Sequence, residues 1–71
     1  MSTREEHIAW CKRRALQYLN AGDPPNAFTS FCSDMRQHPE TFIEPEAVQV
    51  GLLLITQGNS AELRRWIEGF R

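Results

Sequence analysis

Apolar residues recur at three- and four-residue steps near the start of this 71-residue chain, and that spacing predicts a helix. Two overlapping capping boxes, Ser2-x-x-Glu5 and Thr3-x-x-Glu6, precede the apolar stripe and predict where the helix begins. Gly22 follows the stripe and supplies the left-handed residue that commonly ends a helix. The stripe consists of Ile8, Cys11, Ala15, Tyr18 and Leu19.

A second helix is predicted directly after this turn. Asp23 is a good N-cap, and Pro24 and Pro25 fit a first helical turn, where a missing backbone donor does no harm. The helix ends before Pro39, and the short turn makes the two helices antiparallel neighbours. Its apolar face comprises Ala27, Phe28, Phe31, Cys32 and Met35.

The second half of the chain begins with a connector, residues 38–44, whose Phe42 and Ile43 we expect to pack back onto the first hairpin. A fourth and last helix is predicted after Asn59, which with Glu62 forms another capping pattern. This last helix has an apolar stripe at helical spacing, made of Leu63, Trp66, Ile67 and Phe70.

The third predicted helix, from Pro45 to about Thr56, is apolar on almost every side. Such a helix is normally central, but a short chain has little protein to surround it. We expect it either to lie between the first hairpin and the last helix or to have one face covered by another chain. A symmetric dimer through this helix, extended by Trp10 or Phe42, satisfies the second alternative. The apolar residues are Ala47, Val48, Val50, Leu52, Leu53, Leu54 and Ile55.

The first hairpin resembles a single tetratricopeptide-type repeat, which places small, aromatic, glycine and proline residues at fixed offsets. The positions that carry the resemblance are Ala15, Tyr18, Gly22, Ala27, Phe31 and Pro39. Cys11 and Arg14 stand where the motif opens with bulky apolar residues, and neither fits well. The resemblance implies a scaffold for recognition, without chemistry of its own.

Residues of the first hairpin recur 36 positions later, where Gly51, Leu54, Gly58 and Ile67 follow Ala15, Tyr18, Gly22 and Phe31. We therefore predict an all-α fold in which residues 1–71 form a single domain. Four short helices form two stacked helical hairpins, a mini-bundle. Where the hairpins meet, we expect three largely buried side chains: Tyr18, Phe31 and Leu54.

Charge and composition argue against several classes of partner. A net charge of −1 and an isoelectric point near 6.1 disfavour nucleic-acid and membrane-surface binding. The second predicted helix, with one arginine and two phenylalanines, is a poor recognition helix for DNA. The charged N-terminus is unlike a signal peptide, and the longest apolar stretch, residues 50–55, is too short to span a bilayer. These features predict a cytoplasmic protein with free thiols.

Candidate chemistry is sparse. His7, Cys11, Cys32 and His38 would lie near one another in the hairpin, but their spacing matches no zinc pattern. Cys11 beside His7 lacks the third group that orients a catalytic base. The four glycines form no phosphate-binding loop. We therefore predict no metal, no cofactor and no enzymatic activity.

The surface offers better candidates. Trp10 lies opposite the apolar stripe of the first helix, beside Arg13 and Arg14, and Arg64 adds a second site where cations and aromatics meet. Tryptophan and arginine dominate the binding energy of many protein interfaces. We therefore predict that Trp10, Arg13, Arg14 and Arg64 bind a protein. The alternatives are that Trp10 packs against the last helix or the C-terminal tail, and that arginines near a helix end simply complement its dipole.

Taken whole, the chain resembles small uncharacterised proteins encoded by tailed phages and prophages, from its REEH-x-x-W opening to its RR-x-IEGF close. The resemblance implies a bacterial host cytoplasm and an accessory protein that binds a host or phage protein. By analogy, such binding includes inhibition of a host process or of antiviral defence. We expect a homo-oligomer. The alternative is a protein that sequesters a small anionic ligand at an oligomer interface lined by Arg13, Arg14 or Arg64.

Overall fold

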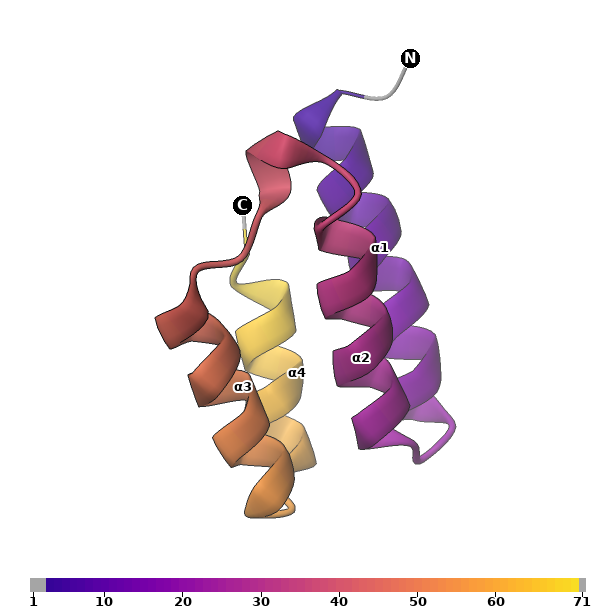
Figure 1. Cartoon of the computed structure of the whole chain (residues 1–71). Helices are drawn as coiled ribbons and strands as arrows, with labels where there is room; N and C mark the ends of the chain where they lie inside the picture. The colour runs from indigo at the N-terminus through magenta and orange to yellow at the C-terminus, as the bar shows by residue number, and fades with distance from the viewer. Residues whose placement is uncertain (1–2, 71) are drawn as a thin grey trace.

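The computed structural model describes residues 3–70, and the regular secondary structure within them is entirely helical (Figure 1). The elements in chain order are α1 (Arg4–Asn20), α2 (Pro24–Met35), the short 3-10 helix η1 (Pro39–Thr41), α3 (Pro45–Thr56) and α4 (Ser60–Glu68). The all-α prediction is confirmed. Of the two candidate capping boxes, the one between Thr3 and Glu6 starts α1, while Ser2 lies outside the described residues.

The helices form two antiparallel hairpins that lie side by side (Figure 1). α1 packs along α2, and α3 packs along α4. Contacts between α2 and α3 and between α1 and α4 join the two hairpins into a small bundle. The prediction of two stacked helical hairpins is thus confirmed.

Both hairpins turn in the same way. Gly22 (φ 79°) and Gly58 (φ 69°) each follow the end of a helix in the left-handed conformation. In both turns the next backbone N–H, from Asp23 or Asn59, donates at 2.9 Å to the carbonyl five residues earlier. The side chains of Asp23 and Asn59 then accept backbone hydrogen bonds from the following helix. One residue therefore ends one helix and begins the next, at positions 36 residues apart.

The core lies where the four helices meet. Phe31 is fully buried, as predicted, and its ring packs against Trp66 and Phe70 at centroid distances of 5.7 and 5.2 Å. Tyr18 is 39% exposed, so its predicted burial is wrong, and Leu54 is only partly buried. Tyr18 lies at the edge of the apolar stripe of α1. A bundle of two hairpins has no additional helix to cover that edge. The buried apolar residues are Ile8, Cys11, Ala15, Leu19, Ala27, Phe31, Met35, Ile43, Leu63 and Ile67.

α3 is the exception among the helices because its single buried residue is Gly51. A Cβ atom at Gly51 would lie 2.6 Å from Phe28 and 2.9 Å from Trp66, so both rings rest against bare helix backbone. Leu52 and Leu53 are each 55% exposed, which contradicts a central position for α3. These two side chains also point about 100° apart around the helix axis.

One of the two predictions for the connector, residues 38–44, is confirmed and the other is wrong. Ile43 is buried, but Phe42 is 59% exposed. The buried hydroxyl of Thr41 donates to the carbonyls of Met35 and His38 and so anchors η1 to the end of α2. The chain leaves this anchor extended, and adjacent side chains in extended backbone point in opposite directions. Ile43 therefore faces the core and Phe42 faces solvent.

Candidate protein-binding site

The outer side of α1 carries a tryptophan that contacts two neighbours on the same helix. Trp10 is partly buried against the core, and its ring stacks on His7 with 5.8 Å between centroids and 27° between planes. The guanidinium carbon of Arg14 also lies over this ring, 4.8 Å from its centre. All three residues lie on one helix at the four- and three-residue steps that align side chains. The indole is therefore fixed in position before any partner arrives.

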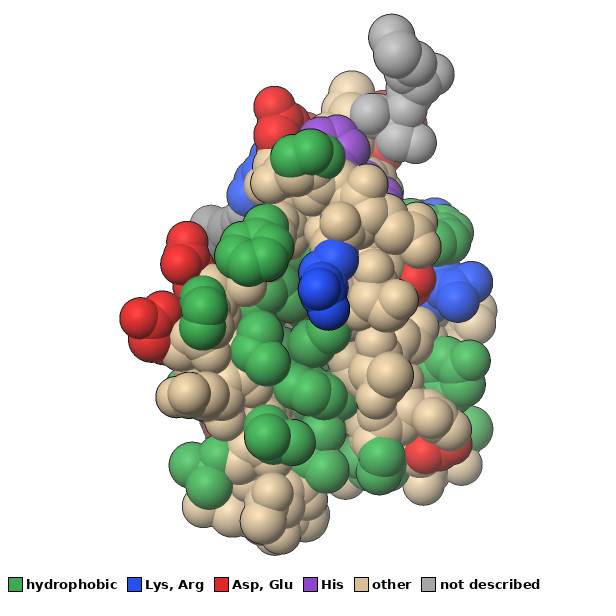
Figure 2. Space-filling model, in the orientation of Figure 1, with side chains coloured by type: hydrophobic (Ala, Val, Ile, Leu, Met, Phe, Trp, Pro, Cys, Tyr) green, Lys and Arg blue, Asp and Glu red, His purple; other side chains and the backbone are tan. Residues whose placement is uncertain are grey.

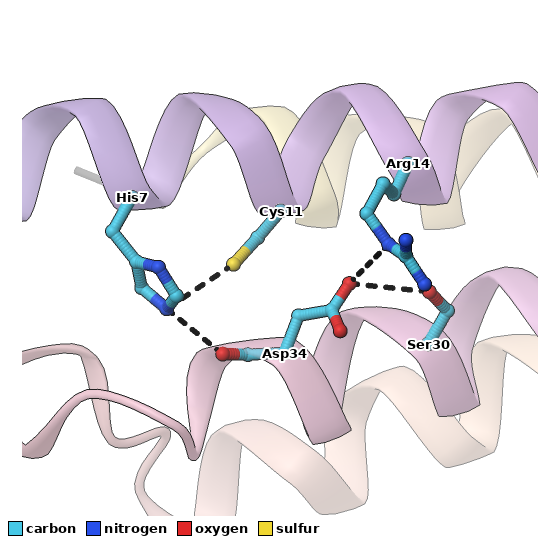
Figure 3. A network of polar contacts seen from close by, with 5 residues as sticks. All are labelled: His7, Cys11, Arg14, Ser30 and Asp34. Carbon is cyan, nitrogen blue, oxygen red and sulfur yellow. Dashed lines mark hydrogen bonds and ion pairs between the residues drawn. The ribbon is translucent and has the colours of Figure 1, made fainter. Parts of the chain in front are cut away.

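A buried carboxylate holds Arg14 in turn. Arg14 Nε donates to Asp34 Oδ2 at 2.8 Å, and the hydroxyl of Ser30 donates to the same oxygen at 3.3 Å (Figure 3). Asp34 is 4% exposed, whereas the side chain of Arg14 keeps 46% of its surface in solvent. The ion pair therefore joins α1 to α2 while leaving one edge of the guanidinium accessible.

Asp34 also connects to the candidate chemical groups of the first hairpin through its backbone. His7 Nε2 lies 2.8 Å from the carbonyl oxygen of Asp34, and Cys11 Sγ lies 3.6 Å from the same nitrogen (Figure 3). A carbonyl only accepts, so we assign the proton to His7 Nε2. His7 is thereby positioned to support the Trp10 ring rather than to act as a base toward Cys11.

Both cysteines are free thiols without the features of a nucleophile. Burial raises the pKa of Cys11 to about 11, with a further contribution from the charge of Asp34. Burial also raises the pKa of Cys32. A reactive cysteine has a lowered pKa instead. Within residues 3–70, no three His, Cys, Asp or Glu side chains are grouped so that they could hold a metal ion.

Arg13 is the exposed cation beside this arrangement. A hollow of about 490 Å³ separates the outer face of α1 from the segment that follows α2. Within the described chain, the guanidinium of Arg13 makes no hydrogen bond or ion pair, so its charge is available to a partner. The residues that line the hollow are Glu6, His7, Ala9, Trp10, Arg13 and Gln37.

The structure separates Arg64 from the other three predicted site residues. Arg64 Nη2 donates to Asn20 Oδ1 at 2.6 Å, at the C-terminal end of α1. Asn20 lies seven residues from Arg13, which is about 10 Å along a helix. Trp10, Arg13 and Arg14 therefore form one surface, whereas Arg64 joins α4 to the far end of α1.

Tyr18 belongs to this surface, although its sequence position suggested the core. It lies four residues after Arg14, which lies four residues after Trp10, so the three side chains follow one row along α1. Arg14 and Tyr18 also line a shared hollow on this face. The i, i+4, i+8 spacing of tryptophan, arginine and tyrosine was the signal that could have identified this row. We call Trp10, Arg13, Arg14 and Tyr18 the α1 surface.

Comparison with protein-family models, with curated proteins and with solved structures finds no match for this chain. None of the described helices combines the length and the apolar character needed to cross a bilayer.

Proposed function

We propose that this protein is a non-enzymatic accessory protein of a phage or prophage that acts by binding a host or phage protein, and that it works as a homo-oligomer. The observation that supports binding is the α1 surface, where the Trp10 ring contacts both His7 and Arg14 beside an unpaired Arg13. Tryptophan, tyrosine and arginine are the residue types most enriched among side chains that dominate interface energy.

Preorganisation strengthens this interpretation. An immobilised side chain loses less conformational entropy when a partner binds, so more of its contact energy appears as affinity. The ion pair between Arg14 and Asp34 and the stacking of His7 restrict the two groups that flank Trp10. A partner would therefore meet an indole and a guanidinium edge that are already in place.

The charge on this surface indicates the chemistry of the partner. Arg13 has no acidic partner within the described chain, and Arg14 shares only part of its guanidinium with Asp34. An acidic group on the bound protein, next to an apolar or aromatic side chain that packs on Trp10, fits this surface. We propose that the bound protein is inhibited by occlusion, in keeping with the small size of the chain.

The alternative of a sequestered anionic ligand receives less support. Arg14 is engaged by Asp34, Arg64 is engaged by Asn20, and Arg13 is distant from Arg64. One chain therefore does not gather these arginines into an anion site, and the alternative depends wholly on an oligomer interface. A rise in melting temperature with nucleotides or inorganic phosphate would favour it, because a ligand that binds the folded state stabilises that state.

Capture from lysates of phage-infected bacteria tests the proposal. We expect the tagged wild-type chain to retain a specific protein that Trp10→Ala and Arg13→Ala lose. Arg65→Ala is the matched control, because Arg65 is an exposed arginine on α4 with 78% of its side chain in solvent. Equal retention by all four chains would contradict a role for the α1 surface.

A further inference from the structure

We propose that the groove between α2 and α3 is the surface through which this chain self-associates, and that its occupant is a second copy of the chain related by a twofold axis. The inference deepens the self-association stated in the proposed function. It is independent of the α1 surface, which lies elsewhere on the bundle.

The floor of the groove is apolar. Figure 2 shows a band of hydrophobic side chains over α3 and between α3 and α2. Part of this band surrounds a hollow of about 430 Å³. Leu52, 55% exposed, lies one turn after Val48 on the same face of α3 and extends the band along the helix. The hollow is lined by Cys32, Arg36, Phe42, Ile43, Pro45, Val48 and Gln49.

The two rims of the groove carry opposite charges. Arg36 follows the last residue of α2 and lines the hollow, whereas Glu44 and Glu46 flank the first residue of α3. Among the described residues, none of these three side chains makes an ion pair or a side-chain hydrogen bond. α2 and α3 are antiparallel, so α2 ends at the end of the bundle where α3 begins (Figure 1). A cation and two carboxylates therefore stand at one level, across an apolar groove.

A twofold axis that runs along the groove brings these charges together. It places the α3 rim of each copy against the α2 rim of the other, so that Arg36 faces the partner's Glu44 and the partner's Glu46. The same contact forms twice, as an isologous interface requires. An acidic peptide would neutralise only Arg36, and a basic peptide would neutralise only the acidic rim. A second copy satisfies both rims at once.

The area that a stable dimer must bury is large enough that the interface has to include both rims of the groove. A typical specific interface buries about 800 Å² on each partner. That is roughly a sixth of the 4780 Å² of accessible surface on this chain. The apolar floor must therefore be joined by Phe42, Leu52 and the charged rims. Leu53 lies one turn after Gln49, which lines the hollow, and so belongs to the α3 rim. Val50 points away from the groove and lies outside this interface.

Charge reversal tests the inference. Light scattering at tens of micromolar should report a dimer for the wild type. We expect Arg36→Glu and the double variant Glu44→Lys/Glu46→Lys each to raise the dimer dissociation constant at least tenfold at low salt, because both contacts become repulsive. An equimolar mixture of the two variants should recover the dimer, because a heterodimer restores both attractive contacts. Failure of the mixture to recover would overturn this geometry.

Leu52→Asp and Val50→Asp form a matched pair, because both are exposed apolar residues of α3 and only Leu52 faces the groove. We expect Leu52→Asp to dissociate the dimer and Val50→Asp to leave it intact, with unchanged circular dichroism for both. A monomeric wild type, or a dimer lost only with Val50→Asp, would overturn the inference. Capture through the α1 surface distinguishes the two proposals: Arg36→Glu should keep the Trp10-dependent protein, whereas Arg13→Ala should keep the dimer.

Discussion

The two hairpins of the bundle turn at equivalent glycines but fill the space between their helices differently. In the first hairpin, α1 contributes four buried residues that pack on α2. In the second, the one buried residue of α3 is Gly51, and the space is filled by the rings of Phe28 and Trp66. Phe28 belongs to the first hairpin, so the second hairpin takes part of its core from its neighbour.

The two hairpins also differ in the hydrogen bonds that join their helices. Arg14 and His7 both reach from α1 to Asp34 on α2, through its carboxylate and its carbonyl. In the part of the chain that the structure describes, no side-chain hydrogen bond joins α3 to α4. The first hairpin therefore has directional contacts of its own, whereas the second is specified mainly by packing against the first.

The largest expected effect comes from the side chain that joins the two hairpins. Phe31→Ala should lower the free energy of unfolding by about 3–5 kcal/mol, because it removes a fully buried ring that packs on α4. Urea unfolding followed by circular dichroism measures the loss. Phe42→Ala is the control, since that ring is 59% exposed. A loss below roughly 1 kcal/mol for Phe31→Ala would show that the hairpins are held together elsewhere.

Removal of either partner of the ion pair between Arg14 and Asp34 should destabilise the fold, but by different amounts. Arg14→Ala leaves the carboxylate of Asp34 buried with only the hydroxyl of Ser30 as a donor, so we expect a loss of about 2–3 kcal/mol. Asp34→Ala leaves a guanidinium that is 46% exposed and can be hydrated, so we expect about 1 kcal/mol. Thermal or urea unfolding of both variants gives the comparison. A larger loss for Asp34→Ala would mean that the carboxylate is not the buried partner of the pair.

The close contact of two aromatic rings with Gly51 predicts that alanine at this position destabilises the fold, although alanine has the higher helix propensity. Alanine in place of glycine normally stabilises a helix by about 1 kcal/mol, but a Cβ at Gly51 must displace the rings of Phe28 and Trp66. We expect a net loss of about 1–2 kcal/mol for Gly51→Ala in urea unfolding. The reciprocal variant at the equivalent position, Ala15→Gly, should lose more than the roughly 1 kcal/mol due to propensity, because the methyl group of Ala15 is fully buried. A gain in stability for Gly51→Ala would show that the rings yield freely.

The smallest effect concerns alkaline pH. The pKa of Cys11 is about 11 in the folded chain, above the value of 9.0 for an unperturbed thiol. Folding thus favours the protonated form, and its contribution to stability is complete below pH 9 and declines as pH rises toward 11. Unfolding free energies at pH 8 and pH 10.5 should show this decline, and Cys11→Ala should lessen it. An identical decline in the variant would assign it to other groups.

The sequence predicted the local features of the fold correctly. The turn at Gly22, the caps at Asp23 and Asn59, and the start of α3 at Pro45 each depend on a few neighbouring residues. The 36-residue recurrence was also informative, since positions 22 and 58 adopt the same backbone conformation. These elements follow from capping and backbone geometry, which a short stretch of sequence contains.

Features that depend on neighbouring helices were predicted less well. Tyr18 and Phe42 are apolar residues at plausible core positions, yet the bundle covers neither. The burial of Asp34 had no signal in the sequence, because it depends on Arg14 of another helix. For the candidate site, sequence reasoning singled out Trp10, Arg13 and Arg14 and set Arg64 in a second cluster, but it could not place that cluster relative to the first. The position of Arg64 depends on the hydrogen bond between α4 and the end of α1.

The seating of Gly51 against Phe28 also has a consequence for the order of folding. The first 36 residues hold most of their contacts within one local hairpin, so they need no long loop closure to form. The second hairpin needs the ring of Phe28 as a surface before α3 can dock. We therefore expect the N-terminal half to fold first, in the order in which synthesis releases it, and to act as the template on which the C-terminal half forms.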